Sequence, residues 1–532
     1  MKRGADVVVD ALVAAGVSHL FSLSGNQILS LYDATLDRGL PIIHTRHEAA
    51  AVHMADAWGR LTERPGVALV TAGPGHLNAI SALYGALMAE SPVVLLSGHA
   101  PLGQIGRGAF QEVDQVAAAT PVTKAAWLAR DAAGLGGDIA RAIDIAVSGR
   151  PGPVHVSLPN DLLDARITPA APPPPMPGTS PLDERQVAAI LDALVRAARP
   201  LVLLGPAMAR IQRRAAVDRF CSLTGIAALP VESPRGVNDP WLHGASSVLG
   251  ESDVVVLLGK KLDFAIRFGE PPAFAPGTQF IQIDPDPGAL QPDRVALALA
   301  GDPTAVVEHL TALGAGIEWK HRPWGDEILA RRRATAPDWA TLRMAPTVPM
   351  HPLRVCHALQ PYLDRGAVLV NDGGEFGQWT QAGLETERRL INGLAGSIGS
   401  AVPMACAAKL ADPTRPVLCV VGDGTFGFHA VELDTAARHG LPIVVVVGND
   451  ARWNAEHQLQ LAHYGPTRTV GCELRPTRYE AVAEALGGHG EFVERPDQLA
   501  PALERAFAAG VPACVNIMID GVAAPTYRQG AH

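Results

Sequence analysis

Short, nearly uninterrupted apolar runs alternate with Ala-rich amphipathic stretches along the chain. The apolar runs predict strands at Val67–Thr71, Val93–Ser97, Val154–Leu158, Leu201–Leu204, Val254–Leu258, Phe280–Ile283, Val368–Val370, Val417–Val421, Ile443–Val447 and Cys514–Ile519. The amphipathic stretches predict helices at Glu48–Leu61, Asn78–Ala89, Gly136–Val147 and Tyr479–Leu486. Strands that are apolar on both faces are typical of parallel sheets covered by helices on both sides. The pattern therefore predicts an α/β fold of several doubly wound parallel sheets.

Two breaks in this alternation divide the chain. The first is Ala171–Pro181, which holds a run of prolines and reads as a stiff, extended linker. The second lies around Trp339–Pro352, after a charged helix. The breaks predict three α/β domains of similar size, at residues 1–168, 182–320 and 350–532.

Composition narrows the class of protein. The chain has 532 residues, of which 48% are hydrophobic, so it can bury large cores and is not a disordered protein. No apolar run approaches the roughly 18–20 residues of a membrane helix. The net charge of −9 and the lack of a basic stripe argue against nucleic acid as a partner. The six cysteines are scattered, which predicts a reduced, cytoplasmic protein rather than a disulfide framework.

A carboxylate stands at the end of one predicted strand and a second oxygen donor at the end of the next. The strand Val417–Val421 runs into Gly422-Asp423-Gly424, and Thr425 follows. The next strand ends in Gly448-Asn449-Asp450. Because ligands bind at the carboxyl edges of parallel sheets, these groups are placed to meet one ligand. Hard oxygen donors beside a Gly turn and a helix N-terminus suit Mg²⁺ shared with phosphate groups.

This arrangement resembles the thiamine diphosphate (ThDP) motif, in which Gly-Asp-Gly is followed by Asn-Asn after the next strand. The resemblance implies that ThDP and Mg²⁺ are the cofactors. It implies Asp423, Asp450 and the backbone carbonyl of Arg452 as metal ligands. The chain departs from the motif at Asn449-Asp450, where the family has two asparagines, and Asn449 competes with Asp450 for the metal.

The first domain carries a second part of the resemblance. Arg46-His47-Glu48 opens an Ala-rich helix, as the family's His-Glu pair does. The resemblance implies that Glu48 hydrogen-bonds the aminopyrimidine ring of the cofactor and activates it. Taken alone, Glu48 would read as an exposed first-turn residue favoured by the helix dipole. The segment Thr71–Gly75, which includes Pro74, and Asn78 follow at the family's positions and imply contact with the same ring.

The third domain supplies the remaining cofactor contacts that the resemblance implies. These residues are Gly374, Glu375, Gly396, Ser397, Ile398, Gly422, Asp423, Gly424, Thr425, Asp450 and Trp453. In the family, an apolar side chain wedges the two rings of the cofactor into a V shape, and Ile398 takes that place. That role is itself a packing contact.

Three further residues bear on the reaction. Gln111, within Gly108–Glu112, resembles the Ala-Phe-Gln-Glu segment of acetolactate synthases, although it also reads as a polar loop residue. Gln27 falls where benzaldehyde lyases carry a histidine. Glu456 falls where pyruvate decarboxylases carry a catalytic glutamate, and it reads equally as a solvated helix residue. The resemblance implies that Gln27 and Gln111 orient the substrate carbonyl and that Glu456 transfers protons.

The favoured hypothesis is a ThDP- and Mg-dependent 2-oxo acid decarboxylase/carboligase similar to acetolactate synthase. One alternative is a carbon–carbon lyase similar to benzaldehyde lyase or 2-hydroxyacyl-CoA lyase, because the acetolactate synthase Gln-Trp-Gln reads Gln458-Leu459-Gln460 here. Another is a non-catalytic ThDP-binding subunit. The expected partners are a small 2-oxo acid, aldehyde or hydroxy-ketone. Whether the central domain binds FAD or ADP stays open. The family builds its site from two chains, which implies at least a homodimer and predicts a homotetramer.

Overall fold

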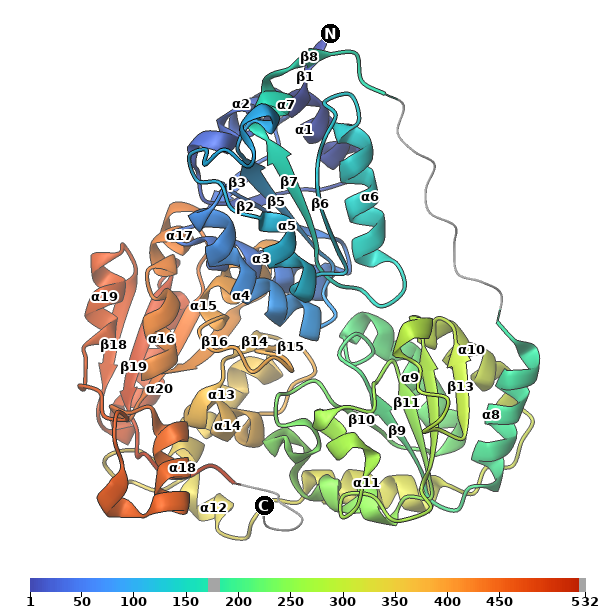
Figure 1. Cartoon of the computed structure of the whole chain (residues 1–532). Coiled ribbons are helices and arrows are strands. Elements are labelled where there is room, and N and C mark those ends of the chain that lie inside the picture. The colour runs from blue at the N-terminus through green and yellow to red at the C-terminus, as the bar shows by residue number, and fades with distance from the viewer. Residues whose placement is uncertain (171–181, 526–532) are drawn as a thin grey trace.

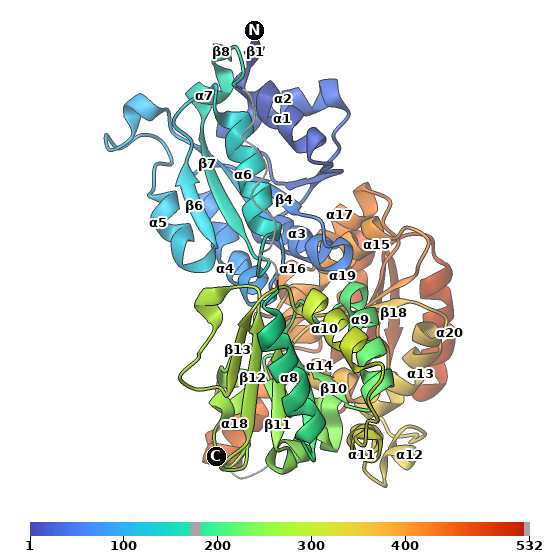
Figure 2. The ribbon, with the colours of Figure 1, turned by 90° about the vertical axis from the view of Figure 1, so that its right-hand side faces the viewer.

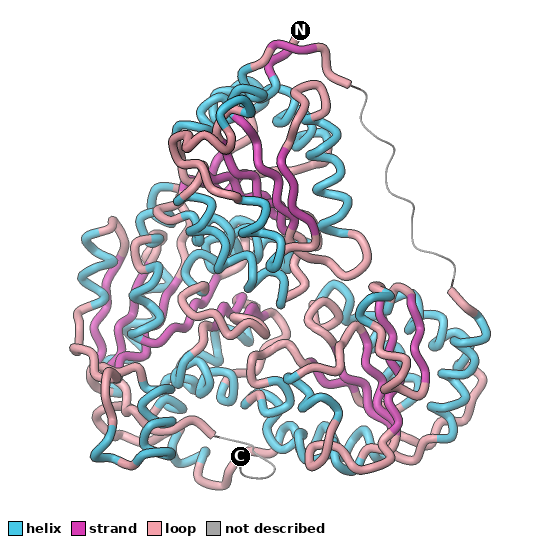
Figure 3. The backbone as a smooth tube through the Cα atoms, in the orientation of Figure 1, coloured by secondary structure: helices cyan, strands magenta, loops and turns pink. Residues whose placement is uncertain are grey.

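The computed structural model describes residues 1–170 and 182–525. It contains three domains arranged as a triangle, each built on a parallel sheet with helices on both faces (Figures 1 and 3). Side chains alternate across each sheet: Val67 and Leu69 enter one core, whereas Ala68 and Val70 enter another. The predicted fold class of three doubly wound parallel-sheet domains is therefore confirmed. Within the described residues, no helix is long and apolar enough to cross a membrane.

The N-terminal domain has a six-stranded sheet in the order β3-β2-β4-β5-β7-β6. Its strands are β2 (Leu20–Ser22), β3 (Ile42–His44), β4 (Gly66–Val70), β5 (Val93–His99), β6 (Ala125–Leu128) and β7 (Val154–Pro159). Its helices are α1 (Gly4–Ala14), α2 (Leu29–Arg38), α3 (Glu48–Thr62), α4 (Pro74–Met88), α5 (Gln115–Ala119), α6 (Leu135–Val147) and α7 (Asn160–Asp164). The short strands β1 (Lys2–Arg3) and β8 (Arg166–Ile167) pair antiparallel beside it.

The central domain has a five-stranded sheet in the order β10-β9-β11-β12-β13. Its strands are β9 (Pro200–Leu204), β10 (Ala228–Pro230), β11 (Val254–Leu258), β12 (Gln279–Asp284) and β13 (Leu297–Ala300). Its helices are α8 (Glu184–Arg196), α9 (Ile211–Thr224), α10 (Pro303–Gly314) and α11 (Arg322–Arg333). Figure 2 shows this domain below the N-terminal domain and in front of the C-terminal one.

The C-terminal domain has a six-stranded sheet in the order β15-β14-β16-β17-β19-β18. Its strands are β14 (Val368–Asn371), β15 (Arg389–Ile391), β16 (Val417–Gly422), β17 (Val444–Asn449), β18 (His489–Val493) and β19 (Ala513–Met518). Its helices are α12 (Trp339–Leu342), α13 (Pro352–Asp364), α14 (Gly374–Gly383), α15 (Ala401–Ala411), α16 (Asp423–His429), α17 (Glu432–Arg438), α18 (Asn454–Tyr464), α19 (Tyr479–Ala485) and α20 (Pro496–Ala508).

The first and third sheets repeat one topology. Numbered within each domain, both have the strand order 2-1-3-4-6-5, and the central sheet follows the same order through its first four strands. Helices α3 and α15 each follow the second strand of their domain, and they pack against each other. One hydrophobic core therefore runs from the first domain into the third, with Ala51 and Ala405 among its buried residues.

The structure adds strands that the apolar pattern did not predict. They are the paired strands β1 and β8, the strand β2, and the two edge strands of each parallel sheet, β3, β6, β10, β13, β15 and β18. Edge strands are short and partly exposed, as in β6, where no residue is fully buried. They consequently lack the uninterrupted apolar signal of a central strand. Helix α4 begins at Pro74, earlier than predicted, because proline is well suited to the first position of a helix.

Candidate functional site

A cavity of about 270 Å³ lies at the carboxyl edge of the C-terminal sheet, where the segments after β14, β16 and β17 meet. The predicted residues that line it are Gly374, Glu375, Gly396, Ile398, Gly422, Asp423, Gly424, Thr425, Asp450, Arg452, Trp453 and Glu456. Ser397 and Asn449 do not line it. Three residues of the central domain, Ser233, Pro234 and Arg235, close one side.

Two carboxylates face this cavity from neighbouring strand ends. Asp423 opens α16 directly after β16, and Asp450 follows β17. Burial, and next the charge of Asp450, raise the pKa of Asp423 to about 7. Burial raises the pKa of Asp450 to about 6. The Oδ2 atom of Asp423 is buried and has no hydrogen-bond partner among the described residues. The charge of Arg452 offsets the burial of Asp450 only in part, and a metal bound between the two carboxylates would stabilise their ionised forms.

The side chain of Asn449 makes its hydrogen bonds to other parts of the domain. Its Nδ2 donates hydrogen bonds to the carbonyl of Thr477 and to Oδ1 of Asn516, each at 3.1 Å. Its Oδ1 accepts a hydrogen bond of 3.2 Å from the backbone N–H of Ala451. The residue is fully buried. Asn449 therefore holds the strand end in shape, and Asp450 is the residue that faces the cavity.

Asp372 holds the segment that carries Ile398, one of the residues lining the cavity. It directly follows β14, and 1% of its surface is exposed. Its Oδ1 accepts hydrogen bonds from the N–H groups of Gly373 at 2.7 Å and Gly399 at 3.0 Å, and its Oδ2 accepts one from Ala401 at 3.1 Å. Burial raises its pKa to about 6. These bonds tie the segment that carries Ile398 to the strand end.

Glycines let the backbone approach the cavity closely. A Cβ atom on Gly424 would lie 2.7 Å from the indole ring of Trp453. Gly374 has φ +86°, a conformation that disfavours any residue with a side chain. Together with the N-termini of α14 and α16, these turns leave backbone N–H groups free to meet an anion.

Charged groups surround the open end of the cavity. The pKa of Glu375 is raised, chiefly by burial and also by the charge of Glu456. Its Oε1 accepts a hydrogen bond of 2.5 Å from the N–H of Ala524. The nearby guanidinium of Arg235 acts in the opposite direction. Sequence reasoning missed Arg235, because it follows β10, one of the edge strands that the apolar pattern did not reveal.

The N-terminal domain gathers a second group of predicted residues. His47 caps α3 by accepting a hydrogen bond from Ala49, so the helix begins at Glu48. Glu48 is 8% exposed, and its Oε2 accepts a hydrogen bond of 3.0 Å from Nδ2 of Asn78. A Cβ atom on Gly75 would lie 3.3 Å from Oε1 of Glu48, so the turn before α4 lies against the carboxylate.

Gln27 and Gln111 join this group. Oε1 of Gln27 accepts a hydrogen bond of 2.6 Å from the hydroxyl of Thr71, at the end of β4. Gln111 has φ +59°, and its carbonyl would lie 2.5 Å from a Cβ atom on Gly73. The carboxylate of Glu112 accepts hydrogen bonds from backbone N–H groups of its own loop, including one of 2.9 Å from Ala109. The loop is therefore held against the Gly73 turn.

The two groups do not form one cavity. No residue of the N-terminal domain lines the cavity beside Asp423 and Asp450. Large apolar side chains are exposed next to each group: Leu77 and Tyr84 on α4, and Phe428 on α16. Glu48 and the carboxylate pair thus stand in two separate groups, and a helix of each domain carries exposed apolar residues.

Three stretches of the chain match models of a known family. Sequence models of the thiamine pyrophosphate enzyme family match residues 2–118 (N-terminal TPP binding domain), 187–310 (central domain) and 372–517 (C-terminal TPP binding domain). Thiamine pyrophosphate is another name for ThDP.

Similar proteins cover nearly the full chain. The acetolactate synthase large subunit IlvG of Mycobacterium tuberculosis is 37% identical over 97% of this chain and 95% of its own length. The 2-hydroxyacyl-CoA lyase of Oryza sativa subsp. japonica is 31% identical over 96% and 94%. Human 2-hydroxyacyl-CoA lyase 2 is 32% identical over 98% and 90%. With all three of its domains matched, the chain belongs to the thiamine pyrophosphate enzyme family.

Proposed function

We propose that this protein is a 2-oxo acid decarboxylase/carboligase that acts like an acetolactate synthase. The observation that carries the proposal is the similarity to the mycobacterial acetolactate synthase over nearly both full chains. The Gln111 loop is a second support, because it resembles a segment of acetolactate synthases and lies against the Gly73 turn. Two of the similar proteins are lyases that act on 2-hydroxyacyl-CoA, so the test must separate the two reactions.

The residues of the C-terminal cavity fit ThDP with Mg²⁺. Asp423, with its unpartnered buried oxygen, and Asp450 would hold the metal, and the backbone carbonyl of Arg452 is the proposed third ligand. The described residues contain no cluster of three or more His, Cys, Asp or Glu side chains that could hold a metal alone. A metal bound by these two carboxylates would take further oxygen ligands, such as phosphate oxygens and water, as Mg²⁺ commonly does. When bound, ThDP supplies the nucleophilic carbon and accepts the electron pair of the bond that breaks.

We assign the chain's own groups as follows. Glu48, held by Asn78, accepts or donates the proton of the cofactor's aminopyrimidine ring. Gln27 and Gln111 donate hydrogen bonds to the substrate carbonyl oxygen. Glu456, exposed at the mouth of the cavity, moves the proton between product and solvent. Arg235 binds the substrate carboxylate, because its guanidinium is the cation that the central domain brings to this cavity.

We infer that two copies of the chain complete each site. No residue of the N-terminal domain lines the cavity beside Asp423 and Asp450, so within one chain each group is a half-site, and helices α4 and α16 carry exposed apolar residues. A homodimer, and a homotetramer built from two such dimers, would cover these surfaces. The free thiols of all six cysteines fit a reducing compartment such as the cytoplasm. Binding of FAD or ADP to the central domain stays a prediction.

Carbon dioxide release tests the proposed reaction. Enzyme supplied with ThDP and Mg²⁺ should release CO₂ from at least one acid in a panel of 2-oxo acids and form a hydroxy-ketone or 2-hydroxy-2-oxo acid product. The Arg235→Gln variant should raise KM for that acid more than it lowers kcat. Cleavage of 2-hydroxyacyl-CoA without CO₂ release would replace the proposal by the lyase reaction. Absence of both reactions would favour a non-catalytic subunit.

Binding of Mg²⁺ and ThDP should release protons at pH 6 but not at pH 8. The raised pKa values of Asp423 and Asp450, about 7 and about 6, mean that the metal-free protein holds protons there near pH 6. Metal binding requires the ionised carboxylates and expels those protons. The same protons make the metal-free protein less stable as pH rises from about 4 to 7, since the folded state binds more protons than the unfolded state in that window.

Calorimetry in two buffers of different ionisation enthalpy measures this release. The Asp423→Asn variant is the reference, because it removes the carboxylate with the higher pKa and should release fewer protons at pH 6. Equal proton release at pH 6 and pH 8 would contradict the assignment of the two carboxylates as metal ligands.

A further inference from the structure

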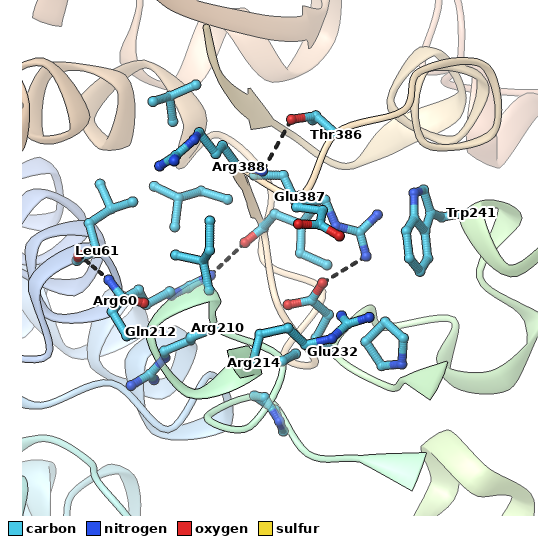
Figure 4. Close-up of a pocket in the computed structure, with 18 of the residues that line it drawn as sticks. Arg60, Leu61, Arg210, Gln212, Arg214, Glu232, Trp241, Thr386, Glu387 and Arg388 are labelled. Atoms are coloured by element: carbon cyan, nitrogen blue, oxygen red, sulfur yellow. Dashed lines mark hydrogen bonds and ion pairs between the residues drawn. The ribbon is translucent and has the colours of Figure 1, made fainter. Parts of the chain in front are cut away.

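A second cavity, of about 610 Å³, lies where the three domains meet (Figure 4). The end of α3 contributes Arg60 and Leu61 from the first domain. The start of α9 and Trp241 come from the central domain, and the segment that leads into β15 comes from the third. It shares no residue with the cavity beside Asp423 and Asp450. Its volume lies within the usual range for sites that bind small molecules.

Arginines dominate the lining of this junction cavity. Eight lining residues are arginines: Arg60, Arg210, Arg214, Arg332, Arg333, Arg388, Arg389 and Arg415. Four are carboxylates: Glu232, Glu385, Glu387 and Asp412. Five of the arginines have a carboxylate within ion-pair distance. Within residues 1–170 and 182–525, Arg210, Arg333 and Arg388 have none. The cavity therefore carries an excess of positive charge.

Arg210 is the most deeply placed of the three. Only 8% of its surface is exposed, and its Nη2 donates a hydrogen bond of 3.0 Å to the carbonyl of Ala89. Its Nε and Nη1 are buried and have no hydrogen-bond partner in the described structure. Burial lowers its pKa to about 9. The buried charge of this guanidinium has no carboxylate partner in the described parts of the chain, and it favours an anion in the adjoining cavity.

The start of α9 adds a further electropositive group. This helix has fourteen residues, Ile211–Thr224, and its N-cap residue Arg210 makes no side-chain capping hydrogen bond. The backbone N–H groups of Ile211 and Gln212 stand in its uncapped first turn, and both residues line the cavity. Backbone N–H groups at a helix start bind phosphate and carboxylate oxygens. Positive groups without a carboxylate partner in the ranges that the structure describes thus reach the cavity from the central and third domains.

We propose that the junction cavity binds a small organic anion that carries two or more phosphate or carboxylate groups. More than one anionic group is required because the unpaired arginines stand on separate elements: Arg210 before α9, Arg333 at the end of α11, and Arg388 just before β15. An organic body is favoured by apolar residues between them, among which are Leu61, Leu229 and Ile391. Arginine forks match phosphate and carboxylate groups in two parallel hydrogen bonds.

Calorimetric titration of the ThDP- and Mg²⁺-loaded protein tests this site. Fructose 1,6-bisphosphate is the phosphate probe and tricarballylate the carboxylate probe, both at constant ionic strength. Saturable binding of at least one probe is expected, and the preferred probe identifies the anionic group. The Arg333→Gln/Arg388→Gln double variant should weaken binding about tenfold or more. Arg130→Gln, which changes an exposed arginine outside the cavity, should leave it unchanged.

Two results would overturn the proposal: no saturable binding of either probe, or equal affinity in the wild type and the double variant. Arg333 and Arg388 are exposed, so their replacement should not unfold the protein, and a thermal melt checks this. Because the readout is the heat of binding with the cofactor site already occupied, the result does not depend on which reaction the enzyme catalyses.

Discussion

Glu48→Gln is expected to lower kcat by about 100- to 10,000-fold, the usual contribution of a positioned proton-transfer group. Glutamine keeps the size of the side chain and can still accept the hydrogen bond from Asn78, so the fold and ThDP affinity should change little. It cannot exchange a proton with the cofactor's ring. Steady-state kinetics with the active 2-oxo acid measure the loss, and calorimetric titration with ThDP measures affinity.

Glu184→Gln is the matched control for this experiment. Glu184 is also the first residue of its helix, α8, but it is exposed and pairs with His309. It should behave as wild type. If Glu48→Gln kept more than a tenth of the wild-type kcat, the result would favour the alternative interpretation, in which Glu48 only interacts favourably with the helix dipole.

Asp423→Ala is expected to weaken Mg²⁺-dependent ThDP binding by about 100-fold or more, since even groups that only support metal ligands cost 10–100-fold when removed. Asp450→Ala should do the same, whereas Asp450→Asn should retain most of the affinity because an amide oxygen still faces the cavity. The metal-free Asp423→Ala protein should be at least as stable as wild type, because the change removes a buried carboxylate with an unpartnered oxygen.

Titration calorimetry and thermal melting of the metal-free proteins measure the two effects. Asp364→Asn, a change of an exposed carboxylate at the end of α13, is the control for the loss of one negative charge. Normal cofactor affinity in Asp423→Ala would remove this residue from the metal site. A large loss in Asp450→Asn would show that the site requires both negative charges.

The fold could be predicted because central parallel strands have a distinct sequence pattern. Val417–Val421 and Val254–Leu258 are buried on both faces, so their sequences are continuous apolar runs. Edge strands such as β15 carry charged residues, as with Arg389, and their sequences look like loops. The repeated strand order of the first and third domains was hidden for the same reason. Three strands of the first domain (the edges β3 and β6, and the very short β2) and the two edge strands of the third were not predicted.

Residues of the candidate site could be predicted where a reactive side chain stands within a recognisable local motif. Asp423 stands in a Gly turn between a strand and a helix, and such a turn can be read without a structure. Arg235 could not be found this way, because its relevance arises only when the central domain closes over the third. Which of Asn449 and Asp450 lines the cavity could also be learned only from the structure, since Thr477 and Asn516, distant in the chain, take the hydrogen bonds of the asparagine.

The shared strand order has a genetic consequence. In the proposed function, the chemistry is divided between two domains of the same strand order: one carries Glu48, and the other carries Asp423 and Asp450. In the proposed homodimer, each site takes one domain from each copy. A chain that has lost Glu48 and a chain that has lost Asp423 would then form a mixed dimer with one doubly defective site and one intact site. Two alleles that are inactive alone would complement each other when expressed in the same cell.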